Sequence, residues 1–492
     1  MKKFLSLLLA AAMSTVLLGA EMTVTAATIQ PAKAEQVVNK TPATYKTLGV
    51  SKSDKNAFKT KVSKDVKLPI INITTKNNKT AVTSREKYVS CVVDVFNCAK
   101  SQTISEASAG VKVRGNSSAY NGEVKEILSN PVPYRIKFDS KTNMLGLNNG
   151  AKCKSWVLLK SDWDLIRNDI ALRFGRAIIG DNAFCSDAQF VHLYVNDKFQ
   201  GIYLLCEQSQ VNKNRVNITE PKKGYKGTDI GYYLAIDNYA TEKNENYVTV
   251  DYGKYKVKDI RGTSRAFVPA EYSIKSDVYS QEQADFIEKY INNLFEIVYK
   301  ACEKGEYLTF DKNYDLVKSK YKNAKDTISA VMDVQSVVDM YLLYEIVHDY
   351  DCGEGSFYMC IDFAKDSKCP KLQFTSPWDF NWAYYDSTNR YWAAAFSEKS
   401  FVQEYGDRSN PWFIVLMKQD WFADMAKQKW TKLYNAGAIQ GCIDEEVAIL
   451  EEYKKDLNKT DANATDCSYY LLEWINDRIK WMNKTFVTKK KG

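Results

Sequence analysis

Acidic residues gather at two places in the second half of the chain, and their types and spacing fit metal-dependent phosphate chemistry. Asp349 and Asp351 follow a long apolar helix predicted over residues 328–347, and a strand predicted over residues 357–361 comes next. Asp379 follows 28 positions after Asp351, in a second acidic stretch. Transfer of a phosphoryl group from ATP needs one carboxylate to orient the attacking hydroxyl and another to hold Mg²⁺ on the phosphates. The two stretches supply such carboxylates.

Spacing within these stretches suggests a role for three residues. Protein kinases carry a metal-binding Asn five residues after the catalytic Asp, and here Ser356 follows Asp351 at that spacing. The Ser356 hydroxyl would be a weaker oxygen ligand, while Asp379 follows a strand, as the Mg²⁺-binding Asp of a kinase does. A plainer interpretation stays open, in which Asp351 is an ordinary acid at a helix end and Asp379 is a turn carboxylate.

Histidine and cysteine usage argues against other kinds of catalysis. The 492-residue chain has only two histidines, His192 and His348, so we expect neither a Ser-His-Asp nor a Cys-His centre. The 11 cysteines include no CxxC pair, which argues against a zinc site, and their odd number leaves at least one thiol without a partner in the chain. The formal net charge of +8 is mild for this length, and we expect no nucleic-acid partner.

Composition divides the chain into five parts. Residues 1–26 place Lys2 and Lys3 before an apolar run that is short for a membrane span, and we interpret them as a secretory signal peptide. The protein is therefore expected to be secreted or held at a bacterial cell surface, without a membrane span. Residues 27–65 are polar and lack a period, which is typical of a linker or a loose N-terminal extension. The remaining parts are a β-rich region (66–208), a helical region (209–487) and a basic tail (488–492).

The β-rich region shows strand periodicity and one helix. Tyr134, Ile136 and Phe138 alternate with Arg135 and Lys137, which is the pattern of a half-buried strand. Turn residues at 195–201 predict a hairpin between the last two strands. A helix is predicted over residues 164–179. The predicted strands cover residues 88–95, 111–114, 134–138, 155–159, 190–195 and 201–206.

The order of these elements resembles the part of a kinase that holds the nucleotide. A loop containing Arg114 and Ser117 precedes a strand bearing Lys137, then a helix, a hairpin and finally Glu207. Lys137 is our choice for the lysine that contacts the phosphates. Two further lysines are alternatives to it, Lys152 and Lys160. The plain alternative for each basic residue is a solvated strand face or a structural ion pair.

Several segments, in the correct order, resemble the CotH (spore coat protein H) kinase family. The resemblance covers about residues 66–400. It rests on segments 111–117 (VKVRGNS), 133–138 (PYRIKF), 156–159 (WVLL), 167–168 (RN), 193–196 (LYVN), 199–205 (FQGIYLL), 207–208 (EQ), 349–351 (DYD) and 378–381 (WDFN).

The resemblance implies an α+β, protein kinase-like fold with a β-rich N-terminal lobe and an α-rich C-terminal lobe. It implies an enzyme that uses ATP and Mg²⁺ or Mn²⁺ to phosphorylate Ser or Thr of secreted, coat or cell-surface proteins. Asp351 would match the catalytic Asp and Asp379 the metal-binding Asp. Asp349 and Asn381 also fall in the family's two acidic motifs, so the expected metal ligands are Asp379, Ser356, Asn381 and Asp349.

Two departures from the family pattern keep a second function open. Asp349 stands where the first motif usually has Asn, and Asn381 stands where the second usually has Asp. These exchanges, together with the scarcity of ATP outside cells, support an alternative in which the chain is a surface binding or adhesion protein of kinase-like shape with weak or no turnover. A carbohydrate-active function lacks a recognisable pair of carboxylates. The acceptor protein and the oligomeric state are not indicated by the sequence.

Overall fold

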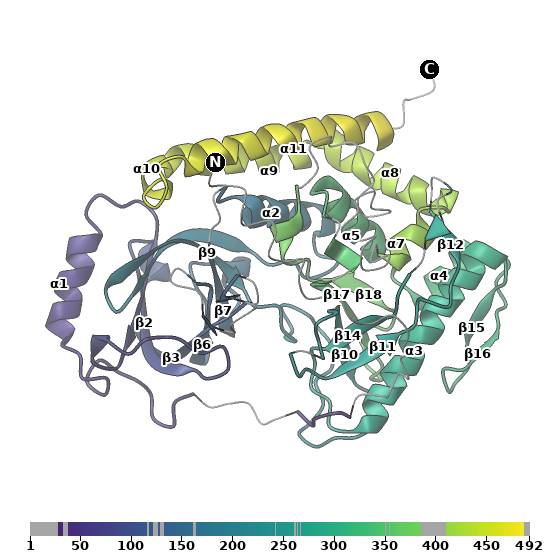
Figure 1. Cartoon of the computed structure of the whole chain (residues 1–492), viewed down its shortest axis with the longest axis horizontal. Helices are drawn as coiled ribbons and strands as arrows, with labels where there is room; N and C mark the ends of the chain where they lie inside the picture. Colours follow the sequence, from purple (N-terminus) through teal and green to yellow (C-terminus); the bar gives the residue numbers. More distant parts are fainter. Residues whose placement is uncertain are drawn as a thin grey trace.

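The computed structural model describes most of the chain, and Figure 1 shows its arrangement. The signal peptide predicted for 1–26 and the tail predicted for 488–492 lie outside the described residues, as does Ser117. The residues described are 28–32, 38–115, 118–121, 126–127, 132–160, 164–241, 243–259, 262, 264–265, 267–349, 351–353, 355–384 and 410–486.

A closed barrel forms the first half of the fold. Its strands are arranged in the order β1-β2-β3-β6-β7-β9-β8, and parallel pairing of β1 with β8 closes it. In β6, Tyr134, Ile136 and Phe138 point into the barrel core, which confirms the predicted alternation. The strands are β1 (Ile70–Thr75), β2 (Val89–Phe96), β3 (Ile104–Val113), β6 (Tyr134–Thr142), β7 (Cys153–Lys160), β8 (Ala188–Val195) and β9 (Lys198–Glu207).

The predicted hairpin is β8–β9, and its turn has a clear local cause. Asn196 and Asp197 both have positive φ values, 52° and 62°. Asn and Asp tolerate this left-handed region better than other non-glycine residues, and a two-residue turn of this kind matches the twist of the flanking strands. The pairing of Val195 with Lys198 confirms the hairpin.

A second sheet, in the order β11-β14-β10-β17-β18, lies in the half that the sequence predicted to be mostly helical. β17 matches the strand predicted over 357–361, and β18 is the strand expected before Asp379. The central strand β10 is buried at every position, so it has no alternating pattern to reveal it. The strands are β10 (Gly231–Ile236), β11 (Tyr247–Val250), β14 (Ala270–Ile274), β17 (Phe357–Asp362) and β18 (Gln373–Thr375).

Helices surround this sheet, and α11 runs along one edge of the molecule (Figure 1). The helix predicted over 328–347 is two helices, because Asp333 accepts a hydrogen bond from the Ser336 N–H and starts a new one. The main helices are α2 (Arg167–Ile179), α3 (Gln281–Tyr299), α4 (Ala324–Val331), α5 (Val334–Ile346), α7 (Pro411–Leu416), α8 (Asp420–Asn435), α9 (Ala438–Glu452), α10 (Lys454–Leu457) and α11 (Ala464–Phe486).

Helix α2 packs against α5 and α9, although its sequence lies within the β-rich region. Arg173 joins α2 to α9 through ion pairs with Glu445 and Glu446, both at 3.0 Å. The predicted boundary at residues 208/209 therefore separates the barrel strands from later strands, but it does not separate α2 from the helices.

The described part of residues 27–65, predicted as a linker or an N-terminal extension, docks on the barrel. Helix α1 (Lys52–Val62) begins at the capping residue Ser51 and packs on the barrel. Tyr45 is buried and donates a hydrogen bond to Asp94 of β2, and the Lys59 ammonium lies 2.6 Å from the same aspartate. Apolar contacts add to these polar pairs, because Phe58 and Val62 pack against Phe96 and Tyr194 of the barrel.

Smaller elements complete the described chain: β4 (Tyr120–Asn121), β5 (Glu126–Ile127), β12 (Val257–Lys258), β13 (Ser264–Arg265), β15 (Leu308–Phe310) and β16 (Leu316–Lys318). None of the helices in the described ranges is both long and apolar enough to cross a lipid bilayer.

Candidate active site

The two acidic stretches meet at one end of the β17–β18 hairpin. After α5 the chain enters a short 3-10 turn over Asp351–Gly353 and then β17, while Asp379 follows β18. The Ser356 hydroxyl lies 3.4 Å from a carboxylate oxygen of Asp379, and the Asp351 N–H donates to Asp349 over 2.9 Å. The antiparallel pairing of Tyr358 with Thr375 brings Ser356 and Asp379 together, because each lies just outside that pair. Ser356 and Asp379 thus lie side by side, and Asp349 and Asp351 lie at the same end of the hairpin.

Electrostatics shows that Asp349 and Asp379 are close. Asp349 is buried, and its burial raises its pKa to about 7. The neighbouring negative charge of Asp379 contributes to this rise, while Arg167 opposes it. Asp379 remains open to solvent at one side, but partial loss of hydration raises its pKa as well, against the opposing charge of Arg114. Two carboxylates therefore share a region where a second negative charge is unfavourable.

These oxygen donors suit a hard divalent cation. Asp349 and Asp379 provide carboxylates, Ser356 a hydroxyl, and Asn381 an amide oxygen, which accepts a hydrogen bond from Asn168 at 3.1 Å. A cation would relieve the repulsion between the two carboxylates, and Mg²⁺ or Mn²⁺ prefers such oxygen ligands. Within the described ranges no three His, Cys, Asp or Glu side chains gather as a metal cluster, so phosphate oxygens of a nucleotide would have to complete the coordination.

Arg114 brings positive charge from the barrel to the acidic site. Its guanidinium lies over the Trp378 ring, 5.5 Å from the ring centre, and its charge partly offsets the rise in the pKa of Asp379 that burial causes. Arg135 is a cation that the sequence did not single out as a binding residue. It lies near Arg114 on the neighbouring strand β6, on the outward face of the barrel. The only sequence signal for it was the alternation along β6.

Lys137 lies farther along the same outward face. It follows Arg135 by two residues in β6, roughly 7 Å along the strand. Burial and the neighbouring charges of Arg135, Arg85 and Lys137 together lower the pKa of Lys112 to about 8. Lys137 therefore belongs to the basic outward face of β6, and Arg114 is the cation from the barrel whose charge acts on Asp379.

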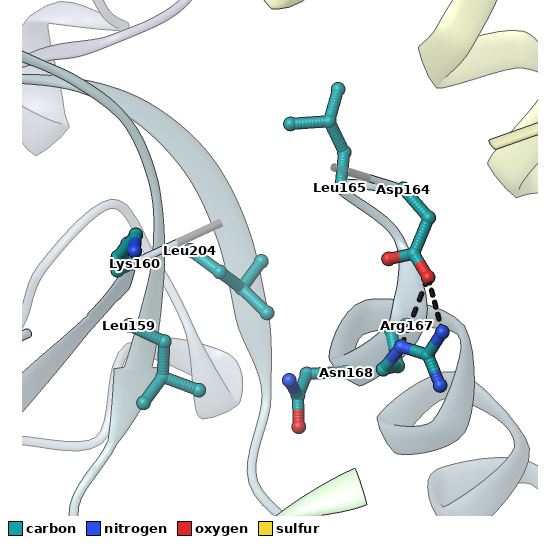
Figure 2. A pocket seen from close by; sticks show the side chains of 7 residues that line it. All are labelled: Leu159, Lys160, Asp164, Leu165, Arg167, Asn168 and Leu204. Carbon is teal, nitrogen blue, oxygen red and sulfur yellow. Dashed lines mark hydrogen bonds and ion pairs between the residues drawn. The ribbon is translucent and has the colours of Figure 1, made fainter. Parts of the chain in front are cut away.

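Figure 2 shows a pocket between the barrel and α2. Lys160 lines it from the end of β7, and Arg167 and Asn168 line it from α2. Asn168 connects the pocket to the acidic site through its hydrogen bonds to the Asn381 side chain and to the Phe380 N–H, both at 3.1 Å. Lys152 is exposed and lies eight residues from Lys160, about 26 Å along β7. Of these two alternatives, Lys160 is the one beside the pocket.

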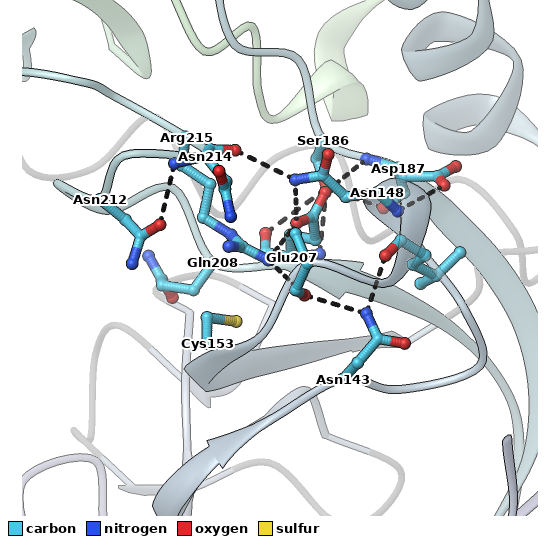
Figure 3. Close-up of polar contacts among 12 residues, drawn as sticks. Asn143, Asn148, Cys153, Ser186, Asp187, Glu207, Gln208, Asn212, Asn214 and Arg215 are labelled. Atoms are coloured by element: carbon cyan, nitrogen blue, oxygen red, sulfur yellow. Dashed lines mark hydrogen bonds and ion pairs between the residues drawn. The ribbon is translucent and has the colours of Figure 1, made fainter. Parts of the chain in front are cut away.

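Glu207 lies in a different environment from the one expected of a nucleotide-binding residue (Figure 3). Its carboxylate is fully buried, with the Arg215 guanidinium at 2.5 Å. The Asn148 side chain and the Asp187 N–H donate hydrogen bonds to its two oxygens, at 2.9 and 3.1 Å. This network joins the end of β9 to the loops before β8 and after β9. The carboxylate is committed to protein partners, and its position supports a structural role.

Comparison with protein-family models matches residues 111–482 to the family described as CotH kinase protein. The chain belongs to the CotH kinase family. The comparison with curated proteins found no match. The family description indicates a kinase-like function, and kinases in general use ATP and a divalent metal.

Burial of Asp349 predicts a distinctive dependence of stability on pH. The folded-state pKa of about 7 lies above the ordinary value of 3.8, so the fold prefers the neutral acid. The contribution of Asp349 to the free energy of unfolding is therefore fully present below pH 4 and is lost as the pH rises from about 4 to 7. We expect Asp349→Asn to unfold like the wild type at pH 4 but to be about 1–3 kcal/mol more stable at pH 8.

Urea unfolding in EDTA across this pH range measures the effect. Asp366→Asn, which changes an exposed aspartate in the β17–β18 loop, is the matched control and should show no such trend. A constant difference between wild type and Asp349→Asn from pH 4 to 8 would show that Asp349 ionises normally.

Proposed function

We propose that this protein is a secreted bacterial kinase of two-lobed, kinase-like architecture. It transfers the γ-phosphoryl group of ATP, with Mg²⁺ or Mn²⁺, to Ser or Thr of secreted, coat or cell-surface proteins. The observation that carries the proposal is the meeting of Asp349, Asp379 and Ser356 beside Arg114, a cation supplied by the barrel. Membership of the CotH kinase family and the predicted signal peptide support it.

Each residue has a distinct part in this proposal. Asp379 and Asp349 would hold the metal with the oxygens of Ser356 and Asn381, and the metal would neutralise charge on the phosphates. Arg114 would bind a phosphate oxygen, because it already lies beside Asp379. Asp351 would accept the proton of the attacking hydroxyl.

The pocket of Figure 2, with about 10 Å³ of accessible space, is too small for a nucleotide, but it lies next to these groups. Lys160 lies on its barrel side, and the Asn168 side chain links it to the acidic site. Lys137 and Arg135 extend the positive surface along β6 and would attract the triphosphate or an acidic acceptor.

Metal binding provides the most direct test. We expect Mn²⁺ with ATP to raise the Tm of the full chain by several degrees and to support incorporation of labelled γ-phosphate into the chain or an added Ser/Thr peptide. Asp379→Asn should need at least about tenfold more Mn²⁺ for the same shift, because it removes a carboxylate from the metal site. Asp366→Asn should behave like the wild type.

The two outcomes that contradict the proposal differ. A thermal shift without phosphate incorporation at any metal concentration would favour the alternative, a surface binding protein of kinase-like shape. No shift with Mg²⁺ or Mn²⁺ in the presence of ATP would show that the acidic site binds neither.

A further inference from the structure

Two cysteines face each other in the hairpin that joins the acidic stretches. Cys360 lies within β17, Cys369 lies in the loop that leads to β18, and their Sγ atoms are 3.6 Å apart. The backbone itself holds them there, because the Asp362 N–H donates to the Cys369 carbonyl over 2.8 Å. Cys360 is also the register partner of Gln373. The fold of the hairpin therefore brings the two residues close together.

The surroundings of the two sulfurs are apolar. Both side chains are buried in a small cluster with Phe184, Val216 and Tyr233. The Cys369 sulfur and the burial raise the pKa of the Cys360 thiol well above its ordinary value. Cys360 is 2% exposed and Cys369 is 7% exposed, so an external reagent would meet Cys369 first.

We propose that Cys360 and Cys369 form a disulfide that closes the β17–β18 loop when the protein meets a disulfide oxidant. Oxidised glutathione represents this class. The Cys369 thiolate attacks one glutathione sulfur, forms a mixed disulfide and releases one glutathione thiolate. Cys360 then loses its proton and attacks the Cys369 sulfur, which releases the second glutathione. The protein loses two protons and two electrons, and one oxidised glutathione takes them up to become two reduced ones.

The position of the two cysteines means that a disulfide between them would fix β17 relative to β18. Cys360 and Cys369 lie toward the loop end of the hairpin, whereas Ser356 and Asp379 lie at the opposite end. A covalent link would hold the two strands that carry these residues in register. It shortens the freely moving loop in the unfolded chain, which is how disulfides stabilise most folds. The inference does not rest on phosphate transfer.

Peptide mapping tests the pairing in the full chain. The protein is incubated with oxidised glutathione, denatured, alkylated without reductant and digested with trypsin. Cleavage after Lys365 and Lys368 places the two cysteines on different peptides, so a disulfide joins them. We expect the peptide ending at Lys365, which also contains Cys352, to be linked to Cys369-Pro370-Lys371. Fragmentation of the linked peptide between Cys352 and Cys360 should place the bond on Cys360, and reduction should release the two peptides. Full alkylation of both cysteines, or linkage of either one to a different cysteine, would overturn the proposal.

Thermal unfolding provides a second measurement. Dithiothreitol should lower the Tm of the oxidised wild type by about 2–5 °C and should leave the Tm of Cys360→Ser/Cys369→Ser unchanged. Cys467→Ser, which changes a half-buried cysteine in α11, is the matched control and should keep the response to dithiothreitol. Equal responses of the wild type and the double variant would count against the disulfide.

Discussion

Replacing Asp351 with Asn is expected to lower the rate of phosphate incorporation by about 10²–10⁴-fold. The side chain is half-buried in the 3-10 turn after α5, and its N–H is fixed by Asp349 at 2.9 Å. An amide of the same shape keeps this backbone contact but cannot accept the proton of an attacking hydroxyl. Single-turnover incorporation of labelled γ-phosphate, at saturating ATP and Mn²⁺, measures the loss without a contribution from product release.

The interpretation depends on nucleotide binding being retained. Asp351→Asn should show the same Tm shift with ATP and Mn²⁺ as the wild type, and Asp366→Asn should keep both the shift and the rate. If Asp351→Asn incorporates phosphate within a factor of two of the wild type, then Asp351 is not the base. If it loses the thermal shift as well, its role lies in metal or nucleotide binding.

Replacing Arg478 with Leu is expected to destabilise the protein by about 3–5 kcal/mol and to lower its Tm by roughly 5–10 °C. Arg478 of α11 and Glu345 of α5 are both fully buried. The guanidinium donates to the Glu345 carbonyl oxygen over 2.8 and 3.1 Å and also to its carboxylate. Leucine would leave the Glu345 charge buried without this partner. The free-energy penalty of such a buried charge is larger than the net stabilisation that the ion pair provides. Urea unfolding at pH 7 measures the difference.

Two further variants separate this effect from a general disturbance of α11. Lys480→Leu changes an exposed residue of the same helix that pairs with Asp477, and it should cost no more than about 0.5 kcal/mol. Glu345→Gln/Arg478→Leu removes the stranded charge and should recover part of the lost stability. If Arg478→Leu is as stable as Lys480→Leu, the buried pair is not important for the fold. Since Glu345 lies four residues before Asp349, this pair also fixes the end of α5 that leads into the acidic site.

The sequence predicted the parts of the fold that carry a regular pattern. β6 alternates, and the β8–β9 turn contains residues that tolerate positive φ, so both were predicted correctly. β10 is buried on both faces, and a continuous apolar run does not distinguish it from a helix segment. The docking of the segment around Tyr45 depends on a partner, Asp94, that lies far away in the sequence. No local pattern encodes such a contact.

The candidate site shows the same division. The acidic residues were recognised because their spacing around β17 and β18 is local, and the hairpin brings Ser356 to Asp379. The basic residues come from the barrel, and their distance from the acidic site depends on how the barrel sits against α2 and the second sheet. The sequence could therefore indicate Arg114 and Lys137 as basic candidates, but it could not show which of the two places its charge close enough to affect Asp379.

The residues that match the family model are not the same as the residues that form the closed barrel. The family match begins at residue 111, yet the barrel includes β1, β2 and most of β3, which lie before it. A fragment cut at residue 111 would lose the neighbours of β6 and β8 and would expose two unpaired strand edges, a known cause of aggregation. The segment that matches the family model is thus shorter than the segment that must fold together. A chimera that swaps domains between family members should therefore include β1 and β2.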